Sequence, residues 1–325
     1  MAQANFGSGH SGPSARAGAA AAMATAVQDR NKDRERDRWD KWAAAMVTAD
    51  VVCRFQDASG RTLLGAPSAF DGSGAPTEAQ LLAEQDLFGD RRLAEERVAV
   101  AKLLAPLDPV VILGIGLNYR RHAVEANMPV PPRPVVFHKS PSTLQHPLGP
   151  IELPVVEAKV DWEVELAVVI GKRCRDVRAE DALGCVLGYT VANDVSGREW
   201  QLEKGGGQWC FGKSFDTFTP LGPVLATTAA ISDPQALQIR TMIDGEVLQD
   251  SSTSDMVHSV AEIVAFLSQG TTLLPGTVIL TGTPEGVGLG MKPQRWLRPG
   301  ETVTVEIEGV GRLTNPVVRA APPAA

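Results

Sequence analysis

The sequence VDWEVELAVVIGK, residues 160–172, decides the fold of this chain. Its apolar residues stand at every second position and alternate with acids, which predicts a β-strand with one face toward a core. Glu163 and Glu165 then point the same way. Two such carboxylates repel each other unless a proton or a cation lies between them, and Mg²⁺, Mn²⁺ and Ca²⁺ prefer oxygen ligands. The strand alone therefore predicts either two metal ligands or the solvated face of a half-buried sheet.

The composition is that of an ordinary water-soluble protein. The 325 residues, 44% hydrophobic and 21% charged, are enough for one large domain or two smaller ones. A net charge of −7 argues against a nucleic-acid partner, and no apolar run is long enough to suggest a membrane span. The four cysteines lack metal or redox spacing, so we expect a reducing compartment, the cytoplasm.

Three regions can be distinguished along the chain. Residues 1–40 read as a disordered and then charged tail, and the scarcity of acids at its start leaves a mitochondrial transit peptide as an alternative. Residues 41–108 suggest a small N-terminal α/β domain, with a hairpin turn at 57–60 and helices after Thr77 and within 94–104. Residues 109–325 form the main domain.

The main domain consists mostly of short predicted strands, which favours a β-rich α+β fold over a doubly wound sheet. Gly114-Ile115-Gly116 follows an apolar strand, as in a dinucleotide-binding loop. Tyr119 stands where that motif needs its third glycine, so we reject this interpretation. The predicted strands cover residues 135–139, 160–170, 187–192, 238–243, 278–281 and 302–308.

A third carboxylate candidate is Asp194, at the end of an apolar strand in GYTVANDVSGREWQ, residues 188–201. Ser196 and Glu199 form an S-x-x-E pattern that predicts the start of a helix. Asp194 is then either a ligand facing a cleft or a second capping residue. Arg198 and Gln201, three residues apart on that helix, can hydrogen-bond an anion.

A second helix is predicted to begin at Asn118 as its cap and to carry residues 119–127. On it His122 and Glu125 lie three residues apart, so the carboxylate can raise the basicity of the imidazole. The pair is either a general base with its partner or a surface contact without a role.

Two further segments can bind an anion. Lys213, in FGKSFDTFTPLGP at 211–223, can neutralise a carboxylate or an enolate, although Asp216 offers a plain salt bridge. The Gly-rich TGTPEGVG at 281–288 presents backbone N–H groups and hydroxyls, including that of Thr283, that can hold a carboxylate. It is otherwise a tight turn between strands.

Taken in order, five of these segments resemble the motifs of the fumarylacetoacetate hydrolase family. The resemblance spans about residues 110–318 and implies a mixed β-roll, a homodimer and a bound Mg²⁺ or Mn²⁺, with Ca²⁺ as another possibility. The five segments are residues 116–125, 160–172, 188–201, 211–223 and 279–288.

The resemblance also implies roles for individual residues. Metal ligands would be Glu163, Glu165 and Asp194. Catalytic residues would be His122 and Glu125, on a lid, together with Lys213. The resemblance implies that Arg198, Gln201 and Lys213 contact the substrate, and we expect Tyr119 and Thr283 to do so as well.

Three departures from the family pattern bear on the site. Residues 111–121 contain no acid, so we expect three protein carboxylates and no fourth. Asn193 replaces a histidine that is frequent in relatives, and the glycines at 205–207 form an insertion before Lys213. Both leave the choice of substrate open.

From these residues we expect an enzyme acting on a small anionic 2-oxo or 2,4-dioxo acid by way of an enolate. Our first expectation is hydrolysis of a C–C bond in an acylpyruvate. The alternatives on the same site are tautomerisation or decarboxylation of oxaloacetate and isomerisation of a dienoate. A non-catalytic binding protein on the same fold is the alternative of another class.

Overall fold

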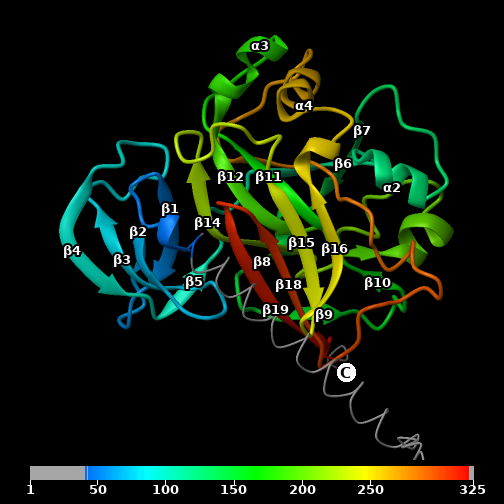
Figure 1. Ribbon diagram of the computed structural model, residues 1–325, viewed down its shortest axis with the longest axis horizontal. Helices are drawn as coiled ribbons and strands as arrows, with labels where there is room; N and C mark the ends of the chain where they lie inside the picture. The colour runs from blue at the N-terminus through cyan, green and yellow to red at the C-terminus, as the bar shows by residue number, and fades with distance from the viewer. Residues whose placement is uncertain (1–40, 42, 322–325) are drawn as a thin grey trace, which may run out of the picture. The chain divides into compact units, whose positions relative to one another are not determined.

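A computed structural model describes residue 41 and residues 43–321, so the predicted tail, residues 1–40, lies outside the described part. The chain from Ala45 onward forms one compact unit, and it is this unit that holds all the elements below. Figure 1 shows its strands and helices by label.

One large mixed sheet runs through the unit. Its strands pair in the order β4-β3-β2-β1-β14-β12-β11-β17-β6-β7, with β5 beside β1 and β8 beside β14. Most neighbours are antiparallel, but β17–β6 and β8–β14 are parallel. The bounds are β1 Val51–Gln56, β2 Thr62–Phe70, β3 Pro76–Leu82, β4 Leu93–Ala99, β5 Lys102–Leu104, β6 Val111–Gly116, β7 Val135–Lys139, β8 Leu144–Gln145, β11 Val164–Ile170, β12 Val186–Asn193, β14 Thr219–Thr227 and β17 Thr277–Leu280.

A second sheet packs against the first. In it the order is β16-β15-β18-β19-β9, and a separate two-stranded pair joins β10 to β13. Strands β11, β12 and β14 contact β15, β18 and β19, which builds the core between two layers (Figure 1). These strands are β9 Ile151–Leu153, β10 Val160–Asp161, β13 Ser196–Gly197, β15 Gln238–Ile243, β16 Glu246–Ser252, β18 Thr302–Ile307 and β19 Gly311–Arg319.

The helices of the described residues are short. Only α4 reaches eight residues, and its start is fixed by a capping box between Ser259 and Glu262. None of them is long and apolar enough to cross a membrane. Their bounds are α2 Arg120–Glu125, α3 Ala179–Ala182 and α4 Val260–Leu267, with single turns η1 Pro141–Thr143, η2 Leu183–Cys185 and η4 Thr253–Asp255 and a π-helix η3 Glu199–Lys204.

The prediction of a β-rich α+β fold with mixed sheets is confirmed. The two helices predicted in the N-terminal region are wrong, because Thr77 lies inside β3 and residues 94–104 form β4 and β5. From β1 to β5 the described chain of this region is built of strands, whereas residues 41 and 43–45 are helical. The hairpin is confirmed, and β1 then pairs with β14, which joins these strands to the large sheet. The boundary near residue 108 stays a prediction.

Strand β11 lies in the middle of the large sheet and all seven of its residues are buried. Both of its faces are covered, so the alternative of a solvated acidic face is wrong. The predicted single strand is also interrupted at Trp162 and Glu163, between β10 and β11. At the interruption the Asn193 side chain accepts a hydrogen bond from Glu163 N at 3.0 Å.

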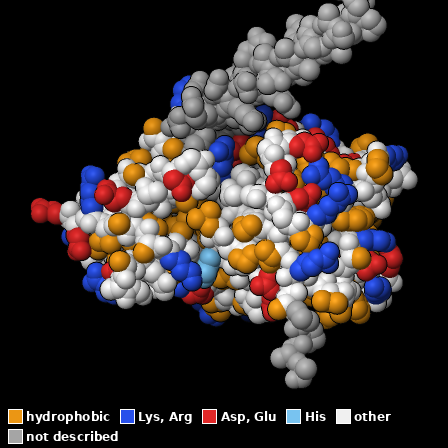
Figure 2. Space-filling model, turned by 90° about the horizontal axis from the view of Figure 1, so that it is seen from below, with side chains coloured by type: hydrophobic (Ala, Val, Ile, Leu, Met, Phe, Trp, Pro, Cys, Tyr) orange, Lys and Arg blue, Asp and Glu red, His pale blue; other side chains and the backbone are white. Residues whose placement is uncertain are grey.

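On the molecular face in Figure 2, basic and acidic side chains are interspersed with apolar ones. This mixed distribution agrees with the modest negative net charge. The expectation of a small substrate rather than a nucleic acid stays a prediction.

Candidate active site

Three acidic side chains meet in the interior of the unit. Glu163 lies just before β11, Glu165 lies on it, and Asp194 follows the neighbouring strand β12. The strand register brings them together, since Asp194 N donates to Glu163 O at 2.8 Å. One carboxylate oxygen from each lies within 4.8 Å of the others, and all three residues are buried. The structure thus brings together the three carboxylates expected from the sequence.

Two buried lysines neutralise this cluster. Lys213 Nζ donates to Glu163 at 2.9 Å, to Asp194 at 2.6 Å and to Ser196 Oγ at 2.8 Å. Lys139, at the end of β7, donates to the other oxygen of Asp194 at 2.5 Å and to two backbone carbonyls. Lys213 is therefore paired with Glu163 and Asp194, and not with Asp216 as the sequence also allowed.

The electrostatics of Glu163 and Glu165 differ. Burial opposes the charge of Glu163, but Lys213 and Arg198 outweigh it and hold its pKa below the ordinary value. Burial and the nearby Asp194 and Glu163 raise the pKa of Glu165 well above the ordinary value. Glu165 thus experiences the repulsion that a cation between the carboxylates would relieve. Three buried carboxylates within reach of one point fit a divalent ion that prefers oxygen ligands.

Arg198 is anchored by Asp161, which the sequence-based assignment of roles overlooked. The guanidinium donates to Asp161 at 2.9 Å and to Gln201 at 2.8 Å, and it lies 2.7 Å from Glu163. Burial lowers the pKa of Arg198, but the two carboxylates outweigh it and raise the pKa above its ordinary value. Arg198 and Gln201 therefore share one face, as predicted, within a charge network that also holds a metal-ligand candidate.

The predicted capping box at Ser196 is wrong. Ser196 lies on β13, and its hydroxyl donates to Asp194 O at 2.9 Å while accepting from Lys213. The helix η3 begins one residue after Arg198 and has no side-chain cap. The hydroxyl is drawn to the buried charges instead, where it satisfies one N–H of an ammonium group.

The Gly-rich segment at 281–288 holds carboxylates, but they are the protein's own. Gly282 N donates to Glu165 at 2.6 Å, and Gly286 N donates to Glu125 at 2.9 Å. Gly288 N donates to Asp161 at 2.7 Å. The segment therefore binds carboxylates through its backbone N–H groups, as predicted, but the carboxylates are three acidic side chains of the protein and not a substrate.

His122 and Glu125 form the predicted pair on α2, with 3.0 Å between His122 Nδ1 and Glu125 Oε2. Because Glu125 also binds Gly286 N, the pair is tied to the Gly-rich segment. The predicted cap by Asn118 is wrong. Its side chain instead accepts from His258 N and donates to the carbonyls of His258 and Thr281, so Tyr119 stands at the cap position without a side-chain bond.

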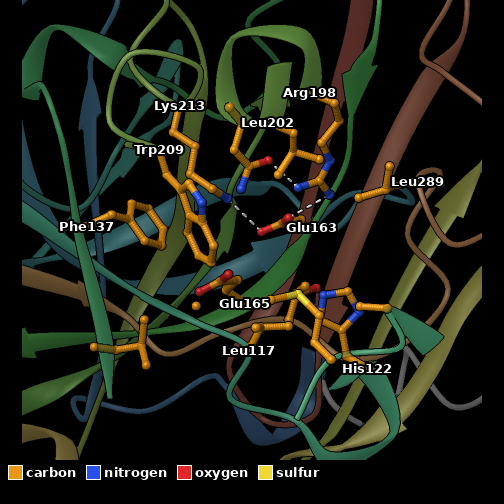
Figure 3. Close-up of a pocket in the computed structure, with 16 residues that line it drawn as sticks. Leu117, His122, Phe137, Glu163, Glu165, Arg198, Leu202, Trp209, Lys213 and Leu289 are labelled. Atoms are coloured by element: carbon orange, nitrogen blue, oxygen red, sulfur yellow. Dashed lines mark hydrogen bonds and ion pairs between the residues drawn. The ribbon is translucent and has the colours of Figure 1, made fainter. Parts of the chain in front are cut away.

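A cavity of about 70 Å³ lies over the carboxylates, small beside the roughly 300–1,000 Å³ of clefts for drug-sized ligands. Figure 3 shows Glu163 and Glu165 at its centre, Arg198 and Lys213 to one side and His122 to the other. Tyr119 is fully buried and absent from its lining, so a substrate contact by this residue stays a prediction. The predicted site residues among its lining are His122, Glu163, Glu165, Arg198, Gln201, Lys213 and Thr283.

Sequence reasoning missed Lys139 and Asp161. Each carried a signal, because Lys139 closes an apolar predicted strand and Asp161 belongs to the alternating acids of residues 160–172. Charged residues that end buried strands are worth testing as parts of a site. Their partners, however, depend on contacts between distant strands.

Comparisons with known proteins agree with this geometry. The family model described as fumarylacetoacetate (FAA) hydrolase C-terminal matches residues 111–318. A mitochondrial oxaloacetate tautomerase of Xenopus laevis is 49% identical over 217 residues, 66% of this chain and 68% of that protein. One from Homo sapiens is 43% identical over 263 residues, 77% of this chain and 82% of that protein.

A solved structure of 2-hydroxyhepta-2,4-diene-1,7-dioate isomerase from Mycobacterium marinum aligns with a TM-score of 0.72 and 39% identity. The alignment covers 84% of this chain and 99% of that one. The match thus extends through the strands that carry the carboxylates as well as the N-terminal strands. The chain belongs to the fumarylacetoacetate hydrolase family and is an enzyme of that family.

Proposed function

We propose that this enzyme interconverts the keto and enol forms of oxaloacetate. The observation that carries the proposal is the position of His122, which lines the same small cavity as Glu163 and Glu165. Relatives that share 49% and 43% of their aligned residues with this chain are named oxaloacetate tautomerases. These names favour tautomerisation over C–C hydrolysis of an acylpyruvate, which was our first expectation.

His122 is the group that moves the proton. Its Nδ1 faces Glu125 at 3.0 Å, so Nδ1 keeps its hydrogen and Nε2 is the free basic nitrogen. In the keto-to-enol direction Nε2 removes a proton from the carbon next to the 2-oxo group, and the imidazolium so formed returns a proton to the oxygen of that group. The reverse direction returns a proton to carbon. No bond between carbon atoms breaks in this reaction, so His122 and Glu125 need no water molecule as a reactant.

The carboxylates Glu163, Glu165 and Asp194 would hold a divalent ion, for which Mg²⁺ and Mn²⁺ are our choices. Such an ion, when bound, withdraws electron density from a 2-oxo group and makes the adjacent C–H more acidic. Lys139 and Lys213 hold Asp194 at a fixed position, and Lys213 also holds Glu163.

Lys213 and Arg198 supply the positive charge of the cavity. Both are nearly fully buried, and both contact Glu163. A positive group in a water-poor site stabilises negative charge on a substrate oxygen more strongly than the same group does in water. Their role in this reaction is to stabilise the oxygen that becomes negative as the carbon loses its proton.

A second candidate is isomerisation of a 2-hydroxydienoate, favoured by the similarity to the dienedioate isomerase of Mycobacterium marinum. It needs the same proton transfer at carbon, with the double bond shifting along a longer chain. Hydrolysis and decarboxylation share the acidic cluster but must break a C–C bond.

The direct test follows the ultraviolet absorbance of freshly dissolved enol-oxaloacetate with Mg²⁺ or Mn²⁺. Because free metal ions also act on oxaloacetate, the controls are buffer with the same ion and the His122→Ala protein. We expect acceleration that needs both the ion and His122. Equal decay with wild-type protein and with buffer would overturn the proposal, and cleavage of acetylpyruvate or fumarylpyruvate would restore hydrolysis.

Assembly and location remain predictions. We propose a homodimer, which sedimentation equilibrium would test. We keep the cytoplasm as the predicted compartment, while the names of the vertebrate relatives favour the mitochondrial alternative.

A further inference from the structure

Two aromatic rings fill the space left by the glycines of β6. A Cβ atom built on Gly114 would lie 2.1 Å from Phe137 Cζ, and one built on Gly116 would lie 2.1 Å from Trp209 Cζ3. Carbon atoms in contact are about 3.5–4.0 Å apart, so any side chain at these positions would displace a ring. The Gly-Ile-Gly sequence that resembles a nucleotide-binding loop is thus explained by ring packing.

Phe137 and Trp209 form one wall of the cavity, which we call the aromatic wall. Their ring centroids are 6.1 Å apart, and both residues line the cavity together with Glu163 and Glu165. Figure 3 shows them on one side of the carboxylates, with Leu289 on the other. Lys213 Nζ lies 4.7 Å from the Phe137 ring centroid, so the wall also touches the charged end of the site.

The two rings differ in exposure. Phe137 is buried on β7, whereas Trp209 is partly exposed and comes from the segment that follows the extra glycines at 205–207. Trp209 therefore stands between the cavity and solvent. Removing its ring would open the cavity outward without touching the carboxylates, His122 or Lys213.

The remainder of the cavity gives a long substrate no charged partner. Among the described lining residues the cations are Arg198 and Lys213, both held at the carboxylate end by Glu163. Apart from His122 and Thr283, the lining away from that end is apolar. It comprises Leu117, Ala126, Met128, Leu202 and Leu289 with the two rings.

We propose that Trp209, packed on Gly116, is a specificity-determining residue that restricts the enzyme to short 2-oxo acids. A short acid keeps all its charged groups near Arg198 and Lys213. A longer chain must push its tail into the Trp209 ring. The inference rests on the proposed function only for placing the 2-oxo end of the ligand at the carboxylate cluster.

The test measures binding by isothermal titration calorimetry with the full chain in Mg²⁺. The probes are 2-oxobutanoate and 2-oxooctanoate, which share the 2-oxo acid end and differ in tail length, and oxalate, a dicarboxylate without a tail that mimics this end. Trp209→Ala should bind 2-oxooctanoate about tenfold more tightly than wild type, since it buries several methylene groups in the opened space. Its affinity for oxalate should change less than about threefold, because substitutions at sites that do not touch each other alter free energies independently to within a few tenths of a kcal/mol.

Two further variants make the test specific. Phe211→Ala removes an aromatic side chain of the same segment that is half exposed and does not line the cavity, so it should leave all affinities unchanged. Trp209→Phe keeps a smaller ring and should give an intermediate gain for 2-oxooctanoate. It also serves if the alanine variant does not fold.

The outcomes separate this inference from the proposed function. The role of Trp209 would be overturned if wild type bound 2-oxooctanoate as tightly as 2-oxobutanoate. It would also be overturned if the ratio of these two affinities were unchanged in both Trp209 variants. If the ratio of affinities changed but the enzyme did not turn over oxaloacetate, the role of Trp209 would be supported and only the tautomerase assignment would be refuted.

Discussion

The packing of Trp209 on Gly116 makes a prediction about stability that needs no substrate. In Gly116→Ala the new methyl group would stand 2.1, 2.8 and 3.3 Å from three carbon atoms of the indole. The ring must move by roughly 1.5 Å to restore an ordinary contact. Forcing an extra methyl group into packed surroundings costs typically about 1–3 kcal/mol. We expect the free energy of unfolding to fall by an amount in the lower half of that range, because Trp209 is partly exposed and its ring can move.

The same substitution should be harmless once the ring is gone. All three of the nearest atoms to the built methyl group belong to Trp209, so Gly116→Ala in a Trp209→Ala background removes the cause of the strain. There it should cost little or even stabilise by a few tenths of a kcal/mol, as alanine restricts the unfolded chain. The double-mutant cycle should therefore give a coupling energy of about 1–2 kcal/mol.

The assay is urea unfolding followed by far-ultraviolet circular dichroism, which does not depend on the tryptophan being removed. Gly184→Ala is the matched control, since a methyl group there meets nothing within 4 Å. It should change the free energy of unfolding by less than about 0.5 kcal/mol. A Gly116→Ala cost that is the same with and without the indole would refute the reasoning, because the strain would then arise in the backbone.

Three other predictions concern the site and its supports. His122→Ala should lower kcat about 10²–10⁴-fold while Mn²⁺ retention is unchanged, and an unchanged kcat would remove this residue from the reaction. Lys139→Met should lower the free energy of unfolding by about 3–5 kcal/mol in urea titrations, since it leaves a buried carboxylate short of a partner, whereas exposed Lys102→Met should change it by under about 0.5 kcal/mol. Ser259→Ala should cost about 1 kcal/mol at pH 7. Backbone and hydroxyl bonds from Ser259 hold the pKa of Glu262 below its ordinary value. The part of the cost that comes from the bond between Ser259 Oγ and the Glu262 carboxylate is therefore present above the unfolded pKa and lost as pH falls through the folded one, whereas the bond from Glu262 N to Ser259 Oγ does not titrate; a cost that does not fall at all at low pH would contradict it.

The parts of the site that depend on local spacing were predictable from the sequence. His122 and Glu125 meet because residues three apart share a helical face, and the same holds for Arg198 and Gln201. The strand that carries Glu165 was evident from its periodicity. What the pattern could not reveal is that both faces of this strand are covered, because that depends on a second sheet from later in the chain.

The failures share a cause, which is that tertiary contacts override local signals. Thr77 had the pattern of a helix cap but lies in β3, between two partner strands. Asn118 and Ser196 had the same pattern, and each hydrogen-bonds a distant segment instead. Lys139 finds Asp194, 55 positions away, only because the fold places both at the centre. The register between strands that are far apart in sequence cannot be predicted from any single segment.

Manganese binding by the full chain, titrated and counted by electron paramagnetic resonance, tests the acidic cluster most directly. The arrangement of Glu163, Glu165 and Asp194 predicts one bound Mn²⁺ per chain and its loss in Glu165→Gln. Glu285→Gln, which alters a nearby acid outside the cluster, should retain the ion. Equal Mn²⁺ binding by wild type and Glu165→Gln would contradict a metal centre at these three carboxylates.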